Sequence, residues 1–353
     1  MTPSADSAAF GRVNEHLGVS RTHPDEPLLV LDDLKTHFRT DRGLVRAVDG
    51  VSLSLRRGES LGVVGESGSG KTVLSRSIMG LLPSTAVTSG SVKFAGQEIL
   101  GLPDKQMRHL WGAEMSMVFQ NPLNSLNPLM KIGKQITEPL KLHLDMDRKN
   151  ARATAAQLLR DVRIPEAERR LDQYPHELSG GMRQRVMIAM AIANNPEVLI
   201  ADEPTTTLDV TVQAQIMELL RDLQHEHHLA LVLITHDLGV VAGSTDRVAV
   251  MYAGRVVETG AVDPLFGHPG HPYTRGLLAC LPRLDERHDI QSSIPGIPTS
   301  PLSLPPGCPF APRCSYAEAA CTDAEPALAP HHQTLAACFV TTRVAADQEV
   351  TAP

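Results

Sequence analysis

The octapeptide GESGSGKT at residues 65–72 is the feature that most constrains what this chain can fold into. It fits the pattern G-x-x-x-x-G-K-[ST] and lies between the short apolar run Leu61–Val64 and a stretch with helical spacing. Glycines at these positions let backbone N–H groups curl around a phosphate, and the following helix points its positive end at the same anion. The sequence therefore predicts a nucleoside triphosphate site, with Lys71 on the β- and γ-phosphates and the Thr72 hydroxyl on Mg²⁺.

Two carboxylates follow another apolar run, Val198–Ala201. A strand end beside a phosphate loop is where carboxylates for metal and water are needed. We expect Asp202 to hold Mg²⁺ through a water molecule and Glu203 to orient and deprotonate the attacking water. The alternative is an acidic turn that ends a strand, because Asp-Glu-Pro is an ordinary turn sequence.

The pattern of apolar residues predicts an α/β fold. The runs Val198–Ala201 and Leu229–Ile234 are continuous, as in parallel strands buried on both faces. Between them, one helical face carries the apolar residues Val212, Ile216, Leu219, Leu220 and Leu223. We expect a tail at 1–26, a nucleotide-binding domain at 27–282 that is mostly helical over 121–195, a small domain at 283–340 and a tail at 341–353.

Composition excludes several classes of protein. The 353 residues include 33 Lys+Arg against 40 Asp+Glu, so bulk electrostatics do not favour nucleic acid. No apolar run approaches the ~18 residues of a membrane span, and the N-terminus lacks the pattern of a secretory signal. Five cysteines indicate free or metal-bound thiols in a cytosolic chain and not a disulfide framework. Any role at a membrane would therefore come through a partner.

A second anion-binding helix end is predicted at residue 179. Ser179 precedes Gly180, Gly181 and a stretch of helical periodicity, so it forms an N-cap whose backbone donors are open to an anion. One nucleotide on one chain does not need two such helix ends. The second one makes sense if it completes the site of another subunit.

With these motifs in order, the chain resembles the ATP-binding subunits of ABC transporters. LSGGM at 178–182 is similar to the family signature LSGGQ, with Met182 in place of glutamine. Gln120 matches the Q-loop glutamine, Asp209 the D-loop aspartate and His236 the switch histidine, and Phe38 lies where an aromatic side chain often stacks on adenine. The resemblance implies an ABC-type domain with a RecA-like parallel-sheet core, an antiparallel β edge and a helical subdomain. It also implies a head-to-tail pair of cassettes that encloses two ATP molecules.

The resemblance assigns residues to each part of the site. ATP binding falls to Phe38, Gly65, Glu66, Ser67, Gly68, Ser69, Gly70, Lys71, Thr72 and Val73; Mg²⁺ to Thr72, Gln120 and Asp202; catalysis to Glu203, His236 and Gln120; the partner's ATP to Leu178, Ser179, Gly180, Gly181 and Met182; and the D-loop to Asp209.

Two further stretches are similar to the peptide/nickel importer group. FQNPLNSLNP at 119–128 resembles its FQDPxxSLNP segment, with Asn121 for aspartate, and HPYTRGLL at 271–278 resembles its HPYTRxLL element. The resemblance implies ATP-driven import of di- or oligopeptides, nickel or another small solute. It also implies two permease subunits, an external solute-binding protein, and a second ATPase subunit that is an identical chain or, as is common in this group, a paralogue. The chain would then be peripheral, at the cytoplasmic face of the inner membrane. The rival class, a soluble ABC ATPase acting on ribosomes or DNA, usually has two cassettes or a long coiled-coil insertion, and the sequence has neither.

Four cysteines gather late in the chain, spaced C-x5-C-x6-C-x16-C, and suggest a metal or cluster site. The spacing lacks the C-x2-C pairs of structural zinc, so Zn²⁺ is the second choice. By resemblance to the same importer group, the expected group is a [4Fe–4S] cluster; free buried thiols are the plain alternative. The residues concerned are Cys308, Cys314, Cys321 and Cys338. Cys280 and the HEHH tract at 225–228 are expected to be core and a solvated helix end.

Overall fold

The computed structural model describes residues 26–206, 208–281 and 293–344. Within them the chain forms two compact units, each assembled from separate stretches of sequence. The first unit takes residues 26–29, 55–59 and 93–232, and the second takes 30–54, 60–92 and everything from 233 onward. The expected tails lie largely outside the described residues, and so does the expected boundary near 283. The proposed domain limits stay predictions.

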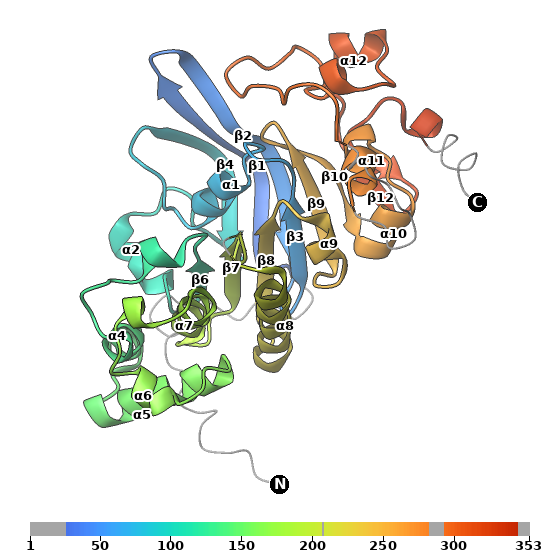
Figure 1. Ribbon diagram of the computed structural model, residues 1–353. Coiled ribbons are helices and arrows are strands. Elements are labelled where there is room, and N and C mark those ends of the chain that lie inside the picture. The colour runs from blue at the N-terminus through green and yellow to red at the C-terminus, as the bar shows by residue number, and fades with distance from the viewer. Residues whose placement is uncertain (1–25, 207, 282–292, 345–353) are drawn as a thin grey trace. The chain divides into compact units, whose positions relative to one another are not determined.

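The first unit combines a short parallel strand pair with a group of helices (Figure 1). Strands β6 and β7 pair in parallel, with every residue of both buried, as continuous apolar runs predict. The helices α4, α5 and α7 contact one another, and α7 also contacts α8. The elements are β5 (Gln97–Glu98), α2 (Asp104–Leu110), β6 (Met115–Val118), α3 (Pro122–Ser125), α4 (Ile132–Leu144), α5 (Arg148–Asp161), α6 (Ala167–Arg170), a 3-10 turn (Pro175–Glu177), α7 (Gly180–Ile192), β7 (Val198–Asp202) and α8 (Val210–His227).

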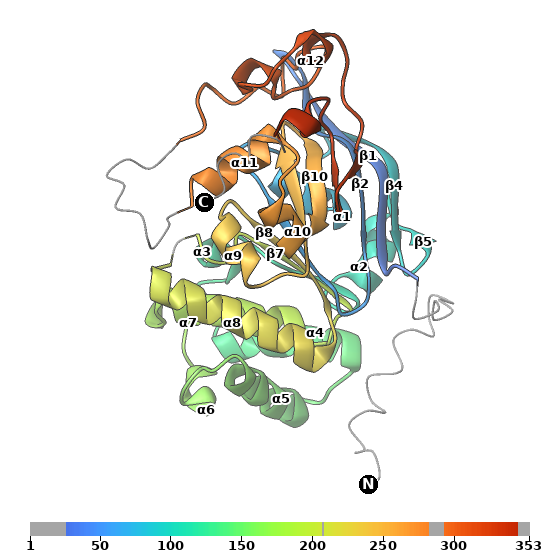
Figure 2. The same cartoon turned by 90° about the vertical axis from the view of Figure 1, so that its right-hand side faces the viewer.

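The second unit holds most of the strands. In its larger sheet the order is β11-β12-β10-β9-β3, with β3 and β9 parallel and the others antiparallel, and a smaller sheet carries β2-β1-β4. Helix α10 contacts β10 and α9 (Figure 2). The elements are β1 (Leu29–Thr40), β2 (Gly43–Leu55), β3 (Ser60–Val64), α1 (Lys71–Ile78), β4 (Ala86–Phe94), α9 (Leu238–Ala242), β9 (Arg247–Tyr252), β10 (Arg255–Ala261), α10 (Val262–Gly267), α11 (Pro272–Ala279), a 3-10 turn (Ala311–Arg313), α12 (Ala319–Asp323), β11 (Ala329–His331) and β12 (Thr334–Ala336); β8 (Ala230–Thr235) runs from the first unit into the second.

The α/β prediction is confirmed in its main parts. Parallel strands, an antiparallel sheet and helices over most of 121–195 are all present. The predicted helix face is buried at Ile216, Leu219, Leu220 and Leu223 on α8, while Val212 is only half-buried. None of the described helices is long and apolar enough to cross a membrane.

A buried carboxylate ties β10 to the start of α11. Glu258 is fully buried and accepts the backbone N–H groups of Gly270 (2.7 Å) and His271 (3.0 Å), while burial raises the pKa of its carboxyl. His271 is 1% exposed, and its Nδ1 accepts the Tyr273 N–H at 3.0 Å as the N-cap of α11. Burial lowers the pKa of His271 to about 3, so this ring stays neutral in the folded protein.

Replacing His271 by asparagine should make folding less sensitive to acid. Below pH 6.5 the unfolded wild-type histidine takes up a proton that the folded one refuses, so stability falls with pH until about 3. His271→Asn keeps an N-cap acceptor but does not titrate. Denaturant unfolding measured between pH 7 and 4 should show that the wild-type protein loses unfolding free energy more steeply than His271→Asn, by up to ~1.4 kcal/mol per pH unit.

The raised pKa of Glu258 acts in the opposite sense, since the folded state then takes up a proton before the unfolded state does. That contribution is present in both proteins and cancels in the comparison. Equal slopes in the two proteins would contradict a neutral buried His271.

Candidate functional site

The phosphate loop of the second unit joins a buried strand to a helix. All five residues of β3 are buried, and α1 begins at Lys71, directly after the loop. Gly70 is the N-cap of α1 with φ +104, where a Cβ atom would stand 2.2 Å from the Ala47 carbonyl oxygen. Only glycine fits this position, because both its backbone conformation and the close approach exclude a side chain.

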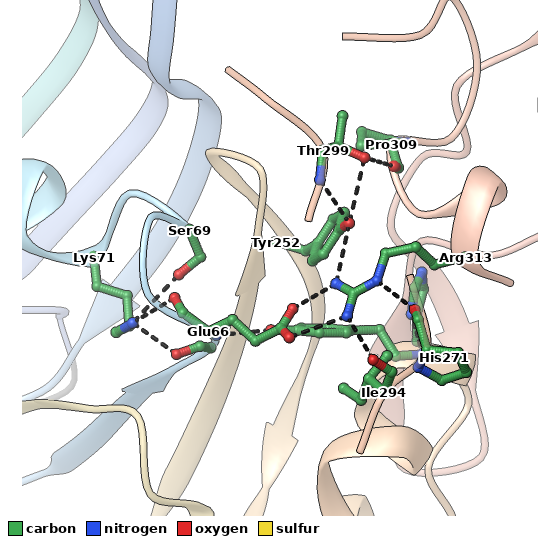
Figure 3. A network of polar contacts seen from close by, with 12 residues as sticks. Glu66, Ser69, Lys71, Tyr252, His271, Ile294, Thr299, Pro309 and Arg313 are labelled. Carbon is green, nitrogen blue, oxygen red and sulfur yellow. Dashed lines mark hydrogen bonds and ion pairs between the residues drawn. The ribbon is translucent and has the colours of Figure 1, made fainter. Parts of the chain in front are cut away.

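The ammonium of Lys71 is buried inside the loop (Figure 3). Its Nζ donates to the carbonyl oxygens of Gly65 (2.7 Å) and Glu66 (3.0 Å) and lies 3.4 Å from the Ser69 hydroxyl. The loop thus surrounds a positive charge. The N-terminus of α1 adds free N–H groups and the positive end of the helix dipole, and both favour an anion at the loop. This arrangement suits a di- or triphosphate.

Other predicted nucleotide residues also belong to the second unit. Thr72 and Val73 are half-buried in the first turn of α1, and Phe38 is half-buried on β1. His236 directly follows β8 and is exposed.

The predicted catalytic residues Gln120 and Glu203 meet in the first unit. Gln120 Nε2 donates to Glu203 Oε2 at 2.7 Å, and the Thr206 hydroxyl donates to the same oxygen at 2.8 Å. Asp202 ends β7 and is 2% exposed. Glu203 has φ +47, an uncommon value for a residue with a side chain, and it turns the chain out of the strand.

Two further predicted motifs of this unit cap helices. Ser179 Oγ accepts the Met182 N–H at 3.3 Å as N-cap of α7, and Asp209 Oδ1 accepts the Val212 N–H at 3.0 Å as N-cap of α8. Ser179 and Gly180 are exposed, so the N-terminus of α7 faces solvent. The predicted site residues therefore fall into two sets, one in each unit.

Two apolar side chains on either side of the Gln120 loop are exposed to solvent. Leu129, after Gln120, is 86% exposed, and Phe119, directly before it, is 40% exposed. Both side chains are therefore accessible to another chain.

The four late cysteines are close enough to influence one another. Burial raises the pKa of the Cys338 thiol to about 12, with the charges of Cys308, Cys314 and Cys321 as further contributions. All four thiols are free, and so is Cys280, which is half-buried. Across the described residues, however, no group of three or more His, Cys, Asp or Glu side chains is placed to hold a metal ion. The expected Zn²⁺ or [4Fe–4S] site thus receives no support from the structure. The HEHH tract forms the end of α8 and one residue beyond it, as expected.

Sequence reasoning missed three residues that contact predicted ones. Thr206 holds Glu203, Tyr273 Oη accepts the Glu66 N–H at 2.8 Å, and Arg313 forms an ion pair with Glu66. Tyr273 lies in the HPYTR motif and Arg313 in the cysteine segment, but a motif does not show which distant residue it touches. Thr206 carried no signal.

Two family models match the chain. One, described as ABC transporter, covers residues 48–206, and the other, described as oligopeptide/dipeptide transporter, C-terminal region, covers residues 257–321. The oligopeptide transport ATP-binding protein OppD of Escherichia coli is 50% identical over 89% of this chain and 93% of its own length. The Haemophilus influenzae protein of the same name is 49% identical over 89% and 97%. A putative peptide import ATP-binding protein of Brucella abortus is 52% identical over 85% and 91%.

Solved structures agree. A dimeric ATP-binding cassette in a post-hydrolysis state with ADP and Pi is 29% identical, with a TM-score of 0.60 over 66% of this chain and 98% of its own. The protein cbiO1 of Clostridium perfringens, part of an ABC transporter complex, is 28% identical, with a TM-score of 0.58 over 69% and 91%.

Two glycines of the loop allow a matched test of its geometry. Gly70→Ala must push the Ala47 carbonyl away, whereas Gly68→Ala, with φ +82, meets no atom within 4 Å. Both variants carry the left-handed strain of ~1–2 kcal/mol, so Gly70→Ala should lose about 1–3 kcal/mol more unfolding free energy. Denaturant unfolding measures the difference. Equal losses would show that the close approach to Ala47 does not constrain the loop.

Proposed function

Because this chain belongs to the ABC transporter family, among the oligopeptide transport ATP-binding proteins, we propose that it is the ATP-hydrolysing subunit of a peptide importer. The observation that carries the proposal is the extent of the similarity: about half of the residues are identical over 85–89% of the chain, and the similarity includes the C-terminal region of oligopeptide/dipeptide transporters. The fold alone would not indicate which solute is transported, because one fold can serve many functions.

The proposed chemistry assigns a role to each motif of the chain. The loop at 65–72 would bind the phosphates through its N–H groups and Lys71. The proposed ligands of Mg²⁺ are the hydroxyl of Thr72, the amide oxygen of Gln120 and the carboxylate of Asp202, which are the hard oxygen atoms that suit this ion. The ion would neutralise charge on the phosphates. Glu203, held by Gln120 and Thr206, would accept the proton of the attacking water, and His236 would help to position that water.

A second cassette would complete each ATP site. The exposed N-terminus of α7 offers backbone N–H donors to an anion. The phosphate loop of this chain already has the N-terminus of α1, so the α7 donors are available to the ATP of a second cassette. The similar cassette structure that is dimeric with ADP and Pi supports this arrangement. Closure on ATP and reopening after hydrolysis would move attached permeases between two states.

Removing the proposed base should separate binding from turnover. Glu203→Gln keeps the shape of the side chain but cannot accept a proton, so ATP turnover should fall by at least ~100-fold while ATP still binds. Phosphate release and ATP binding are measured on the same preparation. Glu218→Gln, at a half-exposed ion pair with Arg163, is the control and should turn over ATP normally. Turnover within twofold of wild type in Glu203→Gln would remove Glu203 as the base.

The exposed loop after Gln120 is the proposed permease contact. Leu129, directly after Pro128, and Phe119, directly before Gln120, offer apolar surface, and the proposed importer subunit would contact membrane subunits. Through this contact the chain would sit at the membrane surface without entering it.

A charge on this surface should uncouple the chain from its permease. Leu129→Asp should reduce peptide uptake and the recovery of permease subunits with the tagged chain from detergent-solubilised membranes, while ATP binding by the purified chain is retained. Leu142→Asp, also strongly exposed but on α4, is the matched control. Unchanged uptake and recovery in Leu129→Asp would place the permease contact elsewhere.

We also propose that the four late cysteines hold a [4Fe–4S] cluster. The support is the sequence alone: four cysteines, the ligand type of such clusters, gather late in a chain that matches the C-terminal region of oligopeptide/dipeptide transporters. A chain purified without oxygen should then carry iron and acid-labile sulfide. Cys308→Ser should lose both, and Cys280→Ser, outside the set, should keep them. Wild-type protein free of iron would end the proposal.

A further inference from the structure

Glu66, the second residue of the phosphate loop, is held by an arginine from the C-terminal region within the same unit (Figure 3). Arg313 Nη1 donates to Glu66 Oε2 at 2.6 Å and Nη2 to Oε1 at 3.1 Å, a two-pronged ion pair. The Arg313 side chain is 2% exposed. A buried guanidinium needs a partner of opposite charge, and the Glu66 carboxylate is that partner.

All five N–H donors of Arg313 are used. Besides the two to Glu66, Nε donates to the Pro295 carbonyl (2.9 Å), Nη2 to the Ile294 carbonyl (3.1 Å) and Nη1 to the Tyr252 hydroxyl (3.4 Å). The guanidinium also lies over the ring of Tyr252 at 5.8 Å. Its orientation is therefore set before any ligand arrives, so the Glu66 carboxylate is held by a rigid group.

The backbone of Glu66 is held as well. Its N–H donates to the Tyr273 hydroxyl at 2.8 Å, and Tyr273 is fully buried. Tyr273 packs against Tyr252, with ring centroids 4.7 Å apart. One loop residue is thus fixed at both its main chain and its side chain by residues outside the loop.

A second stretch of the C-terminal region also lies against the loop. Residues 298–301 and loop residues 66–69 line one cavity of about 170 Å³, together with Tyr252. Thr299 anchors this stretch, since its N–H donates to the Tyr252 hydroxyl (3.1 Å) and its Oγ1 to the Pro309 carbonyl (2.7 Å). The Pro301 carbonyl accepts the Arg46 N–H at 3.1 Å.

Charge gives this contact a consequence for binding. A carboxylate in a loop that holds phosphates repels them, and water screens this repulsion only in part, because the Glu66 side chain is 28% exposed. The Arg313 guanidinium cancels that charge and its fork fixes where the carboxylate points.

We propose that Arg313 is a positioning residue for ATP: acting through Glu66, it holds the phosphate loop in shape and balances the carboxylate beside the phosphates. The inference rests on the proposed function, since it presumes that ATP binds at 65–72. It makes the C-terminal region part of the nucleotide site.

Binding of Mg-ATP to the full-length chain, followed by calorimetry, tests the proposal. Arg313→Ala should weaken ATP binding about tenfold, equivalent to ~1.4 kcal/mol. In turnover the loss should appear in KM, with kcat nearly unchanged, because Arg313 does not touch the reacting atoms. Adding Glu66→Gln to Arg313→Ala should restore much of the affinity, since the unbalanced carboxylate is then gone.

Two controls make the outcome decisive. Arg275→Ala removes a comparable arginine, one that bonds the Tyr316 hydroxyl at 2.9 Å and does not contact the loop, and it should bind ATP normally. Lys71→Ala should abolish binding. If Arg313→Ala does not fold, Arg313→Lys replaces it in the same experiment. Lysine keeps the charge but lacks the two-pronged geometry, so the loss of ATP affinity should lie between that of wild type and tenfold.

An affinity in Arg313→Ala equal to that of Arg275→Ala would overturn the inference while leaving the ATP site intact. Equal losses in Arg313→Ala and the double variant would overturn it too, because Arg313 would not be acting through Glu66. A wild-type chain without Lys71-dependent ATP binding would overturn the proposed function and this inference together.

Discussion

The buried ammonium of Lys71 is the interaction around which the phosphate loop is built. A charge with 4% exposure must find oxygen partners, and the loop supplies them by folding its own carbonyl groups at Gly65 and Glu66 back over it. That fold requires glycine at position 70, where the Ala47 carbonyl leaves no room for a Cβ. The same loop directly follows β3, which is buried throughout, and its Glu66 bonds to Tyr273 and Arg313.

The C-terminal region belongs to the same unit as the phosphate loop. Its strands β11 and β12 extend the sheet of β9 and β10, with β12 pairing to β10 at Glu258 and Ala336. Arg313 and Tyr273 then connect the region to the loop.

In the first unit, the candidate catalytic residues form a small network of their own. Gln120 and Thr206 both donate to one oxygen of Glu203, which leaves β7 in a left-handed conformation. The sequence predicted Gln120 and Glu203 from motifs, since each motif has a fixed residue type at a fixed place. It could not predict Thr206, because a threonine in a run of three threonines carries no signal until the turn after β7 places its hydroxyl.

Local pattern determined the elements, the phosphate loop and the family, because apolar periodicity, glycine positions and short motifs are properties of neighbouring residues. The cysteines show where such reasoning ends: their spacing suggested a metal site, yet the described residues place no group to hold an ion, since ligand geometry depends on how distant segments pack. Tertiary structure alone decided that Arg313, 247 residues from Glu66, would meet it. An ion pair over that separation depends on the packing of the whole unit, and nothing in either local sequence encodes it.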